Sequence, residues 1–191
     1  MSTLVIVLRA ASLLAFAGPM LLGVGGRDRE RNTRADRRRG DRTPVLANLA
    51  AFGLFFPSLV TFAGSMEGYA ALLLAVTGCL LAVAGAAVVL RSRAELGFAW
   101  SFVPMADEGT GLVTTGPYRL VRHPIYVGLL MLAMGEALAF NSWPAFVILL
   151  SGIVPTLVWR ACAEEKLLSR TFGERYAHYR KQTKMMIPYL L

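Results

Sequence analysis

The chain has 191 residues, of which 55% are hydrophobic, and its mean hydropathy is +0.53. This composition excludes an ordinary soluble domain, which covers its surface with polar residues, and indicates an integral membrane protein. The formal net charge of +8 does not favour a nucleic-acid partner, because the basic residues lack interleaved aromatic side chains and lie where a membrane topology requires them.

Five apolar stretches predict an all-α bundle of five transmembrane helices in a single domain. The third stretch runs about 22 residues without a charge, more than the ~20 that a helix needs to cross a bilayer. A cleaved signal peptide is the alternative for the first stretch, but Arg9 lies inside its apolar run and a basic segment follows it at once. The stretches are residues 4–24, 45–64, 69–90, 125–140 and 145–162.

Polar and small residues inside these stretches predict their packing. We expect Arg9 to extend to the outer interface, with a buried functional charge as the alternative. Glu136 lies four or five residues before the outer turn, which favours an interfacial or interhelical hydrogen-bonding role over a transport function. The third stretch has a face of small residues suited to close helix packing in lipid, made of Gly78, Ala82, Gly85 and Ala86.

The basic residues predict the orientation. Nineteen of the 20 Lys and Arg lie in three segments, eight in 27–42, four in 91–122 and seven in 160–184. If all five stretches cross, these segments share one side, which the positive-inside rule assigns to the cytoplasm. We therefore expect a multi-pass protein of a plasma (inner) membrane, with its N-terminus outside and its C-terminus inside. The compact five-helix architecture favours a prokaryotic source.

The last two stretches predict a tight antiparallel helical hairpin over residues 124–162, because only the turn around residues 141–144 separates them. After Cys162 the sequence becomes charged but keeps apolar side chains at helical intervals, interrupted at Gly173. Residues 164–179 are therefore expected to form a cytoplasmic amphipathic segment, along the inner membrane surface or over the helix ends.

Polar residues gather where the fourth stretch begins and the fifth ends. Pro124 suits the first turn of a helix and so places Arg122 and His123 at a helix N-terminus, which attracts anions. Because the hairpin returns to the same face, Arg160 and Glu164 are expected there too. Simpler alternatives are a capping or interface role for His123 and a surface ion pair between Arg160 and Glu164, which are spaced i,i+4.

Four motifs follow one another in the second half of the chain: LVTTGPY at 112–118, RHPIYVG at 122–128, EEKLL at 164–168, and FG at 172–173 with Tyr176 and Tyr179. Their ordered combination resembles the isoprenylcysteine carboxyl methyltransferase family and its prokaryotic relatives, which in turn resemble phospholipid methyltransferases. The resemblance covers about residues 96–188. Residues 1–90 match only in being transmembrane helices.

The resemblance implies an S-adenosylmethionine-dependent methyltransferase, with S-adenosylhomocysteine as the product and a cytoplasmic site in the cofactor-binding half, residues 91–191. Arg160 would face the acceptor and act in catalysis with Glu164. We expect His123 and the helix start to hold the methionine carboxylate, and Glu164 to meet a cofactor amine or hydroxyl. The implied cofactor contacts are Thr110, Gly111, Leu112, Val113, Tyr118, His123, Pro124, Tyr126 and Glu164.

Methyl transfer from an activated sulfonium requires alignment of the reacting groups rather than acid–base machinery. We expect no metal site, since Cys79 and Cys162 lack metal-ligand spacing, and no obligate protein partner. The acceptor is a lipophilic or small molecule methylated on a carboxylate oxygen, an amine nitrogen or a thiol sulfur. Two alternatives are an NADPH-dependent membrane sterol or enone reductase, which resembles this family near its C-terminus, and a non-enzymatic scaffold or transporter.

Overall fold

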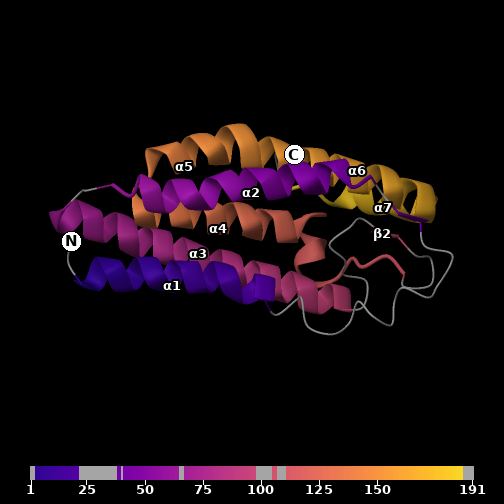
Figure 1. Cartoon of the computed structure of the whole chain (residues 1–191). Coiled ribbons are helices and arrows are strands. Elements are labelled where there is room, and N and C mark those ends of the chain that lie inside the picture. Colours follow the sequence, from indigo (N-terminus) through magenta and orange to yellow (C-terminus); the bar gives the residue numbers. More distant parts are fainter. Residues whose placement is uncertain are drawn as a thin grey trace.

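A computed structural model describes residues 3–21, 38–39, 41–64, 67–97, 105–106 and 111–186. Long helices lying side by side form the molecule, and a two-residue antiparallel ladder lies near one end (Figure 1). The elements are α1 (Thr3–Leu21), β1 (Arg38–Arg39), α2 (Thr43–Thr61), α3 (Gly68–Leu96), β2 (Met105–Ala106), η4 (Gly116–Arg119), α4 (Pro124–Phe140), α5 (Trp143–Ile148), η5 (Leu149–Ile153), α6 (Val154–Phe172) and α7 (Glu174–Gln182).

Among the described residues, three helices are long and apolar enough to cross a membrane: α2, α3 and the continuous helix Trp143–Phe172 formed by α5, η5 and α6. Two shorter apolar helices accompany them, Thr3–Pro19 and Pro124–Phe140. The prediction of a helical membrane protein is thus confirmed, with three candidate spans out of the five predicted. Residues 22–24 of the first predicted stretch, and most of the basic segment 27–42, lie outside the described residues.

Two helices extend further than predicted. Helix α3 continues to Leu96, and an i,i+4 ion pair between Arg91 and Glu95 (3.2 Å) supports its last turn. Helix α6 continues to Phe172, ten residues beyond the predicted end of the fifth stretch at Cys162, so the predicted amphipathic segment is divided between α6 and α7. Residues 163–172 are mostly strong helix formers without Gly or Pro, which explains why charge alone does not end the helix. The break comes at Gly173, whose φ is +52°.

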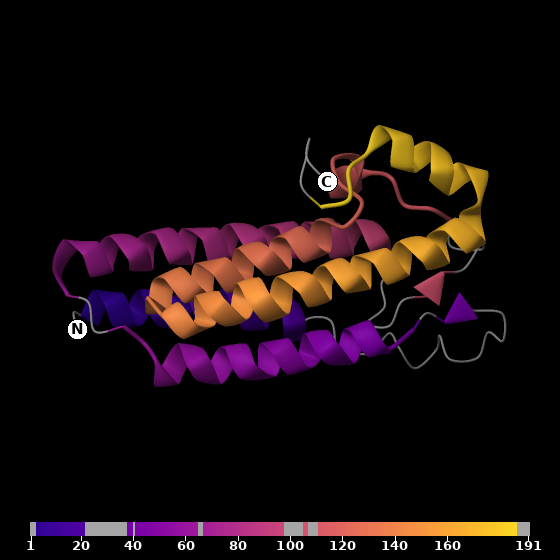
Figure 2. The same ribbon diagram turned by 90° about the horizontal axis from the view of Figure 1, so that it is seen from above.

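Local signals set the turn between α4 and the next helix. Asn141 adopts the left-handed conformation that commonly ends a helix (φ 48°), and the amide of Ser142 donates to the carbonyl of Ala137. From Trp143 the chain runs back beside α4, which lies between α3 and α5–α6 (Figure 2). The π-helical turn η5 ends two residues before Pro155, a residue that cannot donate a backbone hydrogen bond.

Small residues bring α3 and α4 into backbone contact. Gly78 lies against Gly135, and Gly85 against Gly128, so closely that a Cβ atom at Gly85 would lie 2.7 Å from the Gly128 carbonyl oxygen. All four residues of the predicted small-residue face are buried, which confirms that prediction. Close approach of this kind replaces the hydrophobic driving force that helices lack within lipid.

Arg9 and Glu136 connect α1 to the end of α4. The Arg9 guanidinium donates to the carbonyls of Ala139 (2.9 Å) and Phe140 (3.3 Å), which end α4 without helical partners. The Arg9 side chain is therefore buried within the protein, and its guanidinium reaches backbone carbonyls at the predicted outer end of the bundle. The Ser12 hydroxyl lies 3.0 Å from a Glu136 carboxylate oxygen, which confirms the predicted interhelical hydrogen bond.

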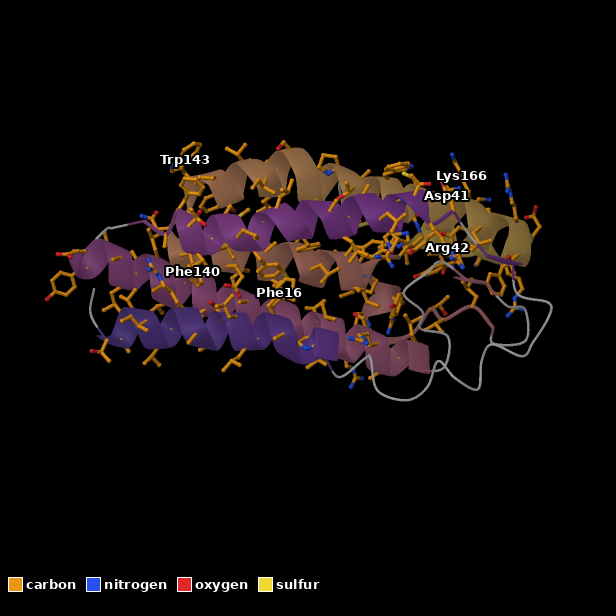
Figure 3. The ribbon with its side chains drawn as sticks, in the orientation of Figure 1. Phe16, Asp41, Arg42, Phe140, Trp143 and Lys166 are labelled. Carbon is orange, nitrogen blue, oxygen red and sulfur yellow. The ribbon has the colours of Figure 1, made fainter. Side chains whose placement is uncertain are left out.

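The two ends of the bundle differ in character. Figure 3 places Phe140 and Trp143 at one end, and Asp41, Arg42 and Lys166 at the other. The start of α4 and the end of α6 point toward this second, charged end (Figure 2). The polar residues singled out from the sequence are thereby brought to the same end of the molecule.

Candidate active site

The chain reaches α4 through residues that pair with the C-terminal segment. The amide of Arg122 donates to the carbonyl of Lys184 (2.8 Å), and the amide of His123 donates to that of Met185 (3.0 Å). Pro124 then lies in the first turn of α4, as predicted. This backbone pairing buries the His123 ring, whose side chain is 5% exposed.

Glu164, in the middle of α6, faces three side chains. Its carboxylate accepts a hydrogen bond from the Tyr126 hydroxyl and lies 3.4 Å from Arg160 Nε and 3.6 Å from His123 Nδ1. The predicted surface-pair alternative for Arg160 and Glu164 is wrong, because their side chains are 12% and 22% exposed. The pair is part of a larger, mostly buried cluster.

Aromatic rings order the same cluster. The rings of His123 and Tyr126 are stacked, with centroids 5.4 Å apart and planes inclined by 3°. The Arg160 guanidinium lies over the Tyr126 ring, 5.3 Å from its centroid. Arg160 is therefore held by both a carboxylate and an aromatic face, which leaves its planar group little freedom to rotate.

Glu165 continues the cluster toward α7. Its Oε1 lies 2.6 Å from Arg122 Nε and 3.6 Å from His123 Nε2, and its Oε2 lies 3.6 Å from Arg180 Nε. Burial on its own would lower the pKa of His123, but the carboxylates of Glu164 and Glu165 outweigh it and raise the pKa above its usual value. The site thus holds an imidazole between two acidic side chains, with arginines around them.

Helix α7 closes one side of the cluster. Its Tyr179 hydroxyl donates to the backbone carbonyl of Tyr118 at 2.6 Å. Burial raises the pKa of Tyr179 to about 12, so the hydroxyl stays protonated and remains a donor at neutral pH. This bond holds η4 against α7.

The loop before η4 is attached to the end of α3. The Thr115 hydroxyl donates to Glu95 (3.0 Å), and a Cβ at Gly116 would lie 2.6 Å from the Glu95 side chain. Both Gly111 and Gly116 have positive φ, 74° and 58°, a conformation that favours glycine. The loop is therefore shaped by glycine and held by one carboxylate.

The structure brings together six of the predicted site residues: Tyr118, His123, Pro124, Tyr126, Arg160 and Glu164. Gly111, Leu112 and Val113 are half-buried in the loop leading to η4, and Thr110 lies outside the described residues. Among the described residues, no group of three or more His, Cys, Asp or Glu is placed to hold a metal ion.

Sequence reasoning did not assign roles to Glu165, Arg180 and Thr183, and it gave Arg122 only a place at the helix start. The only signal available for Glu165 was its position beside Glu164 in a charged pair, because its partners lie on other elements. Its contact with Arg122 spans 43 residues, a separation that no local pattern predicts.

Residues 73–175 match the phospholipid methyltransferase family, and since this is more than half of the chain, the protein belongs to that family. The matched segment begins inside α3, earlier than the resemblance at residue 96, and contains the His123, Tyr126, Arg160 and Glu164 cluster.

Individual relatives are similar over parts of the chain. Protein-S-isoprenylcysteine O-methyltransferase of Saccharomyces cerevisiae is 29% identical over 71% of this chain and 56% of its own length. Protein-S-isoprenylcysteine O-methyltransferase A of Arabidopsis thaliana is 35% identical over 44% and 43%. The cobalt-zinc-cadmium resistance protein CzcN of Cupriavidus metallidurans is 34% identical over 52% and 46%. The chain thus spans about half the length of the curated relatives it matches.

Proposed function

We propose that this protein is an integral membrane methyltransferase that uses S-adenosylmethionine and acts on a lipophilic or small acceptor. The observation that carries the proposal is the joined cluster of His123, Tyr126, Arg160 and Glu164, which lies within the family segment. In the bundle the cluster joins the start of α4 to the middle of α6. A helix bundle that served only as an anchor would not require such a mostly buried, charged arrangement.

The proposed topology has five crossings, α1, α2, α3, α4 and the helix Trp143–Phe172, with α4 and the last helix as an antiparallel hairpin in a single domain. The distribution of basic residues supports placing the charged end in the cytoplasm and the N-terminus outside. The compact five-helix architecture supports placing the protein in a prokaryotic inner membrane. Helix α4 has 17 residues and is about 26 Å long, a little short of a ~30 Å hydrocarbon core. Its start would therefore lie at the membrane boundary, where lipid and aqueous ligands meet.

The side chains of the cluster fit the charges of S-adenosylmethionine, whose methionine part carries an ammonium and a carboxylate. Glu164 matches the ammonium, and His123 Nε2 is buried and makes no hydrogen bond to any described residue. Both His123 nitrogens face carboxylates, so we assign His123 mainly to orienting Glu164 and only secondarily to the methionine carboxylate. Tyr118, Pro124, Tyr126 and residues 110–113 complete the proposed cofactor contacts.

The cofactor supplies an activated methyl group on a sulfonium, and the protein has to align the acceptor with it. We assign this positioning to Arg160, which Tyr126 and Glu164 hold at the membrane boundary. An acceptor carboxylate is ionised at pH 7 and would pair with the guanidinium directly. An amine or thiol acceptor would first lose a proton, and the choice among oxygen, nitrogen and sulfur is open to experiment.

Calorimetry on the detergent-solubilised protein tests the cofactor assignment. We expect S-adenosylmethionine to bind and NADPH not to bind; the opposite result would replace the proposal with the reductase alternative.

The acceptor is then found by incubating the protein with methyl-radiolabelled S-adenosylmethionine and a total lipid and small-molecule extract, followed by identification of the labelled product. Binding of neither S-adenosylmethionine nor NADPH, together with no labelled product, would favour a non-enzymatic role.

A further inference from the structure

The segment 183–186 is fastened to the residues just before α4. Besides the two backbone hydrogen bonds from Arg122 and His123, the Arg122 guanidinium donates to the backbone carbonyl of Thr183, and a second contact reaches the carbonyl of Arg180 at 3.5 Å. Thr183 in turn donates from its hydroxyl to the carbonyl of Tyr179 (2.8 Å). Main-chain and side-chain bonds of one short stretch therefore hold the end of α7 against the start of α4.

Glu165 is the point where these contacts meet α6. One of its oxygens faces both Arg122 and His123, and the other faces Arg180. The Arg122 and Glu165 side chains are only 10% and 11% exposed. A buried ion pair of this kind does not by itself add stability, but removing one partner leaves an uncompensated charge.

We infer that Arg122 and Glu165 are positioning residues that dock the segment 183–186 and fix the His123 ring toward Glu164. They act through His123 and the docked segment, without touching the methyl acceptor. The expected effect on S-adenosylmethionine binding rests on the proposed function. The docking of the segment and the fixing of the ring are properties of this chain alone.

The electrostatics around His123 support this role. The groups facing its ring are Glu164 and Glu165 from α6 and Tyr126 from α4, with Arg122 adjacent in sequence and Arg180 of α7 on the far side of Glu165. Within the described part of the chain, the two carboxylates are the groups that favour the charged imidazole, and their effect exceeds that of burial. Neutralising one of them removes part of what holds the ring charged and oriented.

Hydrogen–deuterium exchange measures the docking directly. The variant Glu165→Gln keeps the size of the side chain but removes its charge, Glu165→Asp is the conservative rescue, and Glu174→Gln, at the exposed first turn of α7, is the matched control. We expect the amides of Arg122 and His123 to exchange about 10 to 100 times faster in Glu165→Gln, because their acceptors belong to the docked segment. Amides in the middle of α3 should not change, and Glu165→Asp should lie between.

Histidine titration by NMR measures the fixing of the ring. The chain has two histidines, so His178 provides an internal reference in the same spectra. The contribution of a raised pKa to stability is complete at low pH and is lost as the pH rises through the folded-state value. We expect Glu165→Gln to lower the pKa of His123, so this loss is complete at a lower pH, and to raise the KM for S-adenosylmethionine about tenfold with kcat changed less than about threefold.

Each outcome decides the inference. Wild-type exchange rates at Arg122 and His123 in Glu165→Gln would overturn the docking role, and an unchanged His123 titration would overturn the fixing of the ring. If Glu165→Gln cannot be extracted as a folded protein, Arg122→Lys decides instead: it keeps the charge but loses the guanidinium fork, and unchanged exchange would again overturn the role. If the wild type binds no S-adenosylmethionine, the proposed function fails, yet the exchange and titration results still test this inference.

Discussion

Replacing Gly85 with alanine tests whether the close packing of α3 on α4 positions the site. The new Cβ would lie 2.7 Å from the Gly128 carbonyl oxygen and 2.8 Å from the Leu132 nitrogen. Both are backbone atoms that cannot rotate away, so α4 would have to move about 0.7 Å to restore an ordinary contact near 3.4 Å. Overpacking of this kind typically costs about 1–3 kcal/mol.

Gly53→Ala is the matched control, because it lies within α2 and a Cβ there meets no atom of the described residues within 4 Å. Both substitutions gain the same helix propensity, about 1 kcal/mol, so their difference isolates the steric term. We expect Gly85→Ala to unfold in SDS–detergent mixed micelles with a free energy about 1–3 kcal/mol below that of Gly53→Ala. Equal stabilities would refute the argument that backbone contact holds α3 to α4.

Movement of α4 should also reach the site. Gly128 lies one helical turn beyond Pro124, so the displacement is carried to His123 and Tyr126. We therefore expect Gly85→Ala to weaken S-adenosylmethionine binding as well, since misplacement of a site by about 1 Å can reduce its function by about 100-fold. Normal binding in a destabilised Gly85→Ala protein would show that the site is positioned by other contacts.

Three further substitutions separate the site from the opposite end of the bundle. Glu164→Gln should reduce methyl transfer by about 100-fold, because it weakens contacts with three side chains at once; activity within twofold of wild type would contradict the assignment. Tyr179→Phe leaves the Tyr118 carbonyl without its donor and should lower the unfolding free energy by about 1–3 kcal/mol in the same micelle assay. Arg9→Met should destabilise by a similar ~1–3 kcal/mol while leaving S-adenosylmethionine affinity unchanged, since Arg9 lies at the far end of α4; weakened affinity would contradict that separation.

The local features of this protein could be read from its sequence. Hydropathy identified three candidate membrane-spanning helices, Pro124 identified the start of α4, and Gly173 identified the break between α6 and α7. Each depends on the residue itself and its near neighbours, which is why these predictions agree with the structure. The end of the last apolar helix was misjudged because the loss of hydropathy after Cys162 does not interrupt helical hydrogen bonding.

Only those site contacts that follow from the order and direction of the helices could be predicted from the sequence. Placing the start of α4 and the end of α6 at one end required nothing more than a chain that turns back, and it correctly brought Glu164 near His123. The sequence could not predict which individual charged side chains pair, because several partners of suitable charge are available to each of them. From the sequence alone, a contact of Arg122 with lipid headgroups and a contact with Glu165 were equally consistent with its charge.

By itself the sequence determined that this is a helical membrane protein with family motifs around the start of α4. The tertiary structure decided which polar groups meet. Arg9 binds carbonyls 130 and 131 residues away, and the Arg122 guanidinium binds a carbonyl 61 residues away. Such contacts depend on how helix ends left without intrahelical partners are brought together in space, and that arrangement follows from packing over the whole bundle rather than from any local pattern.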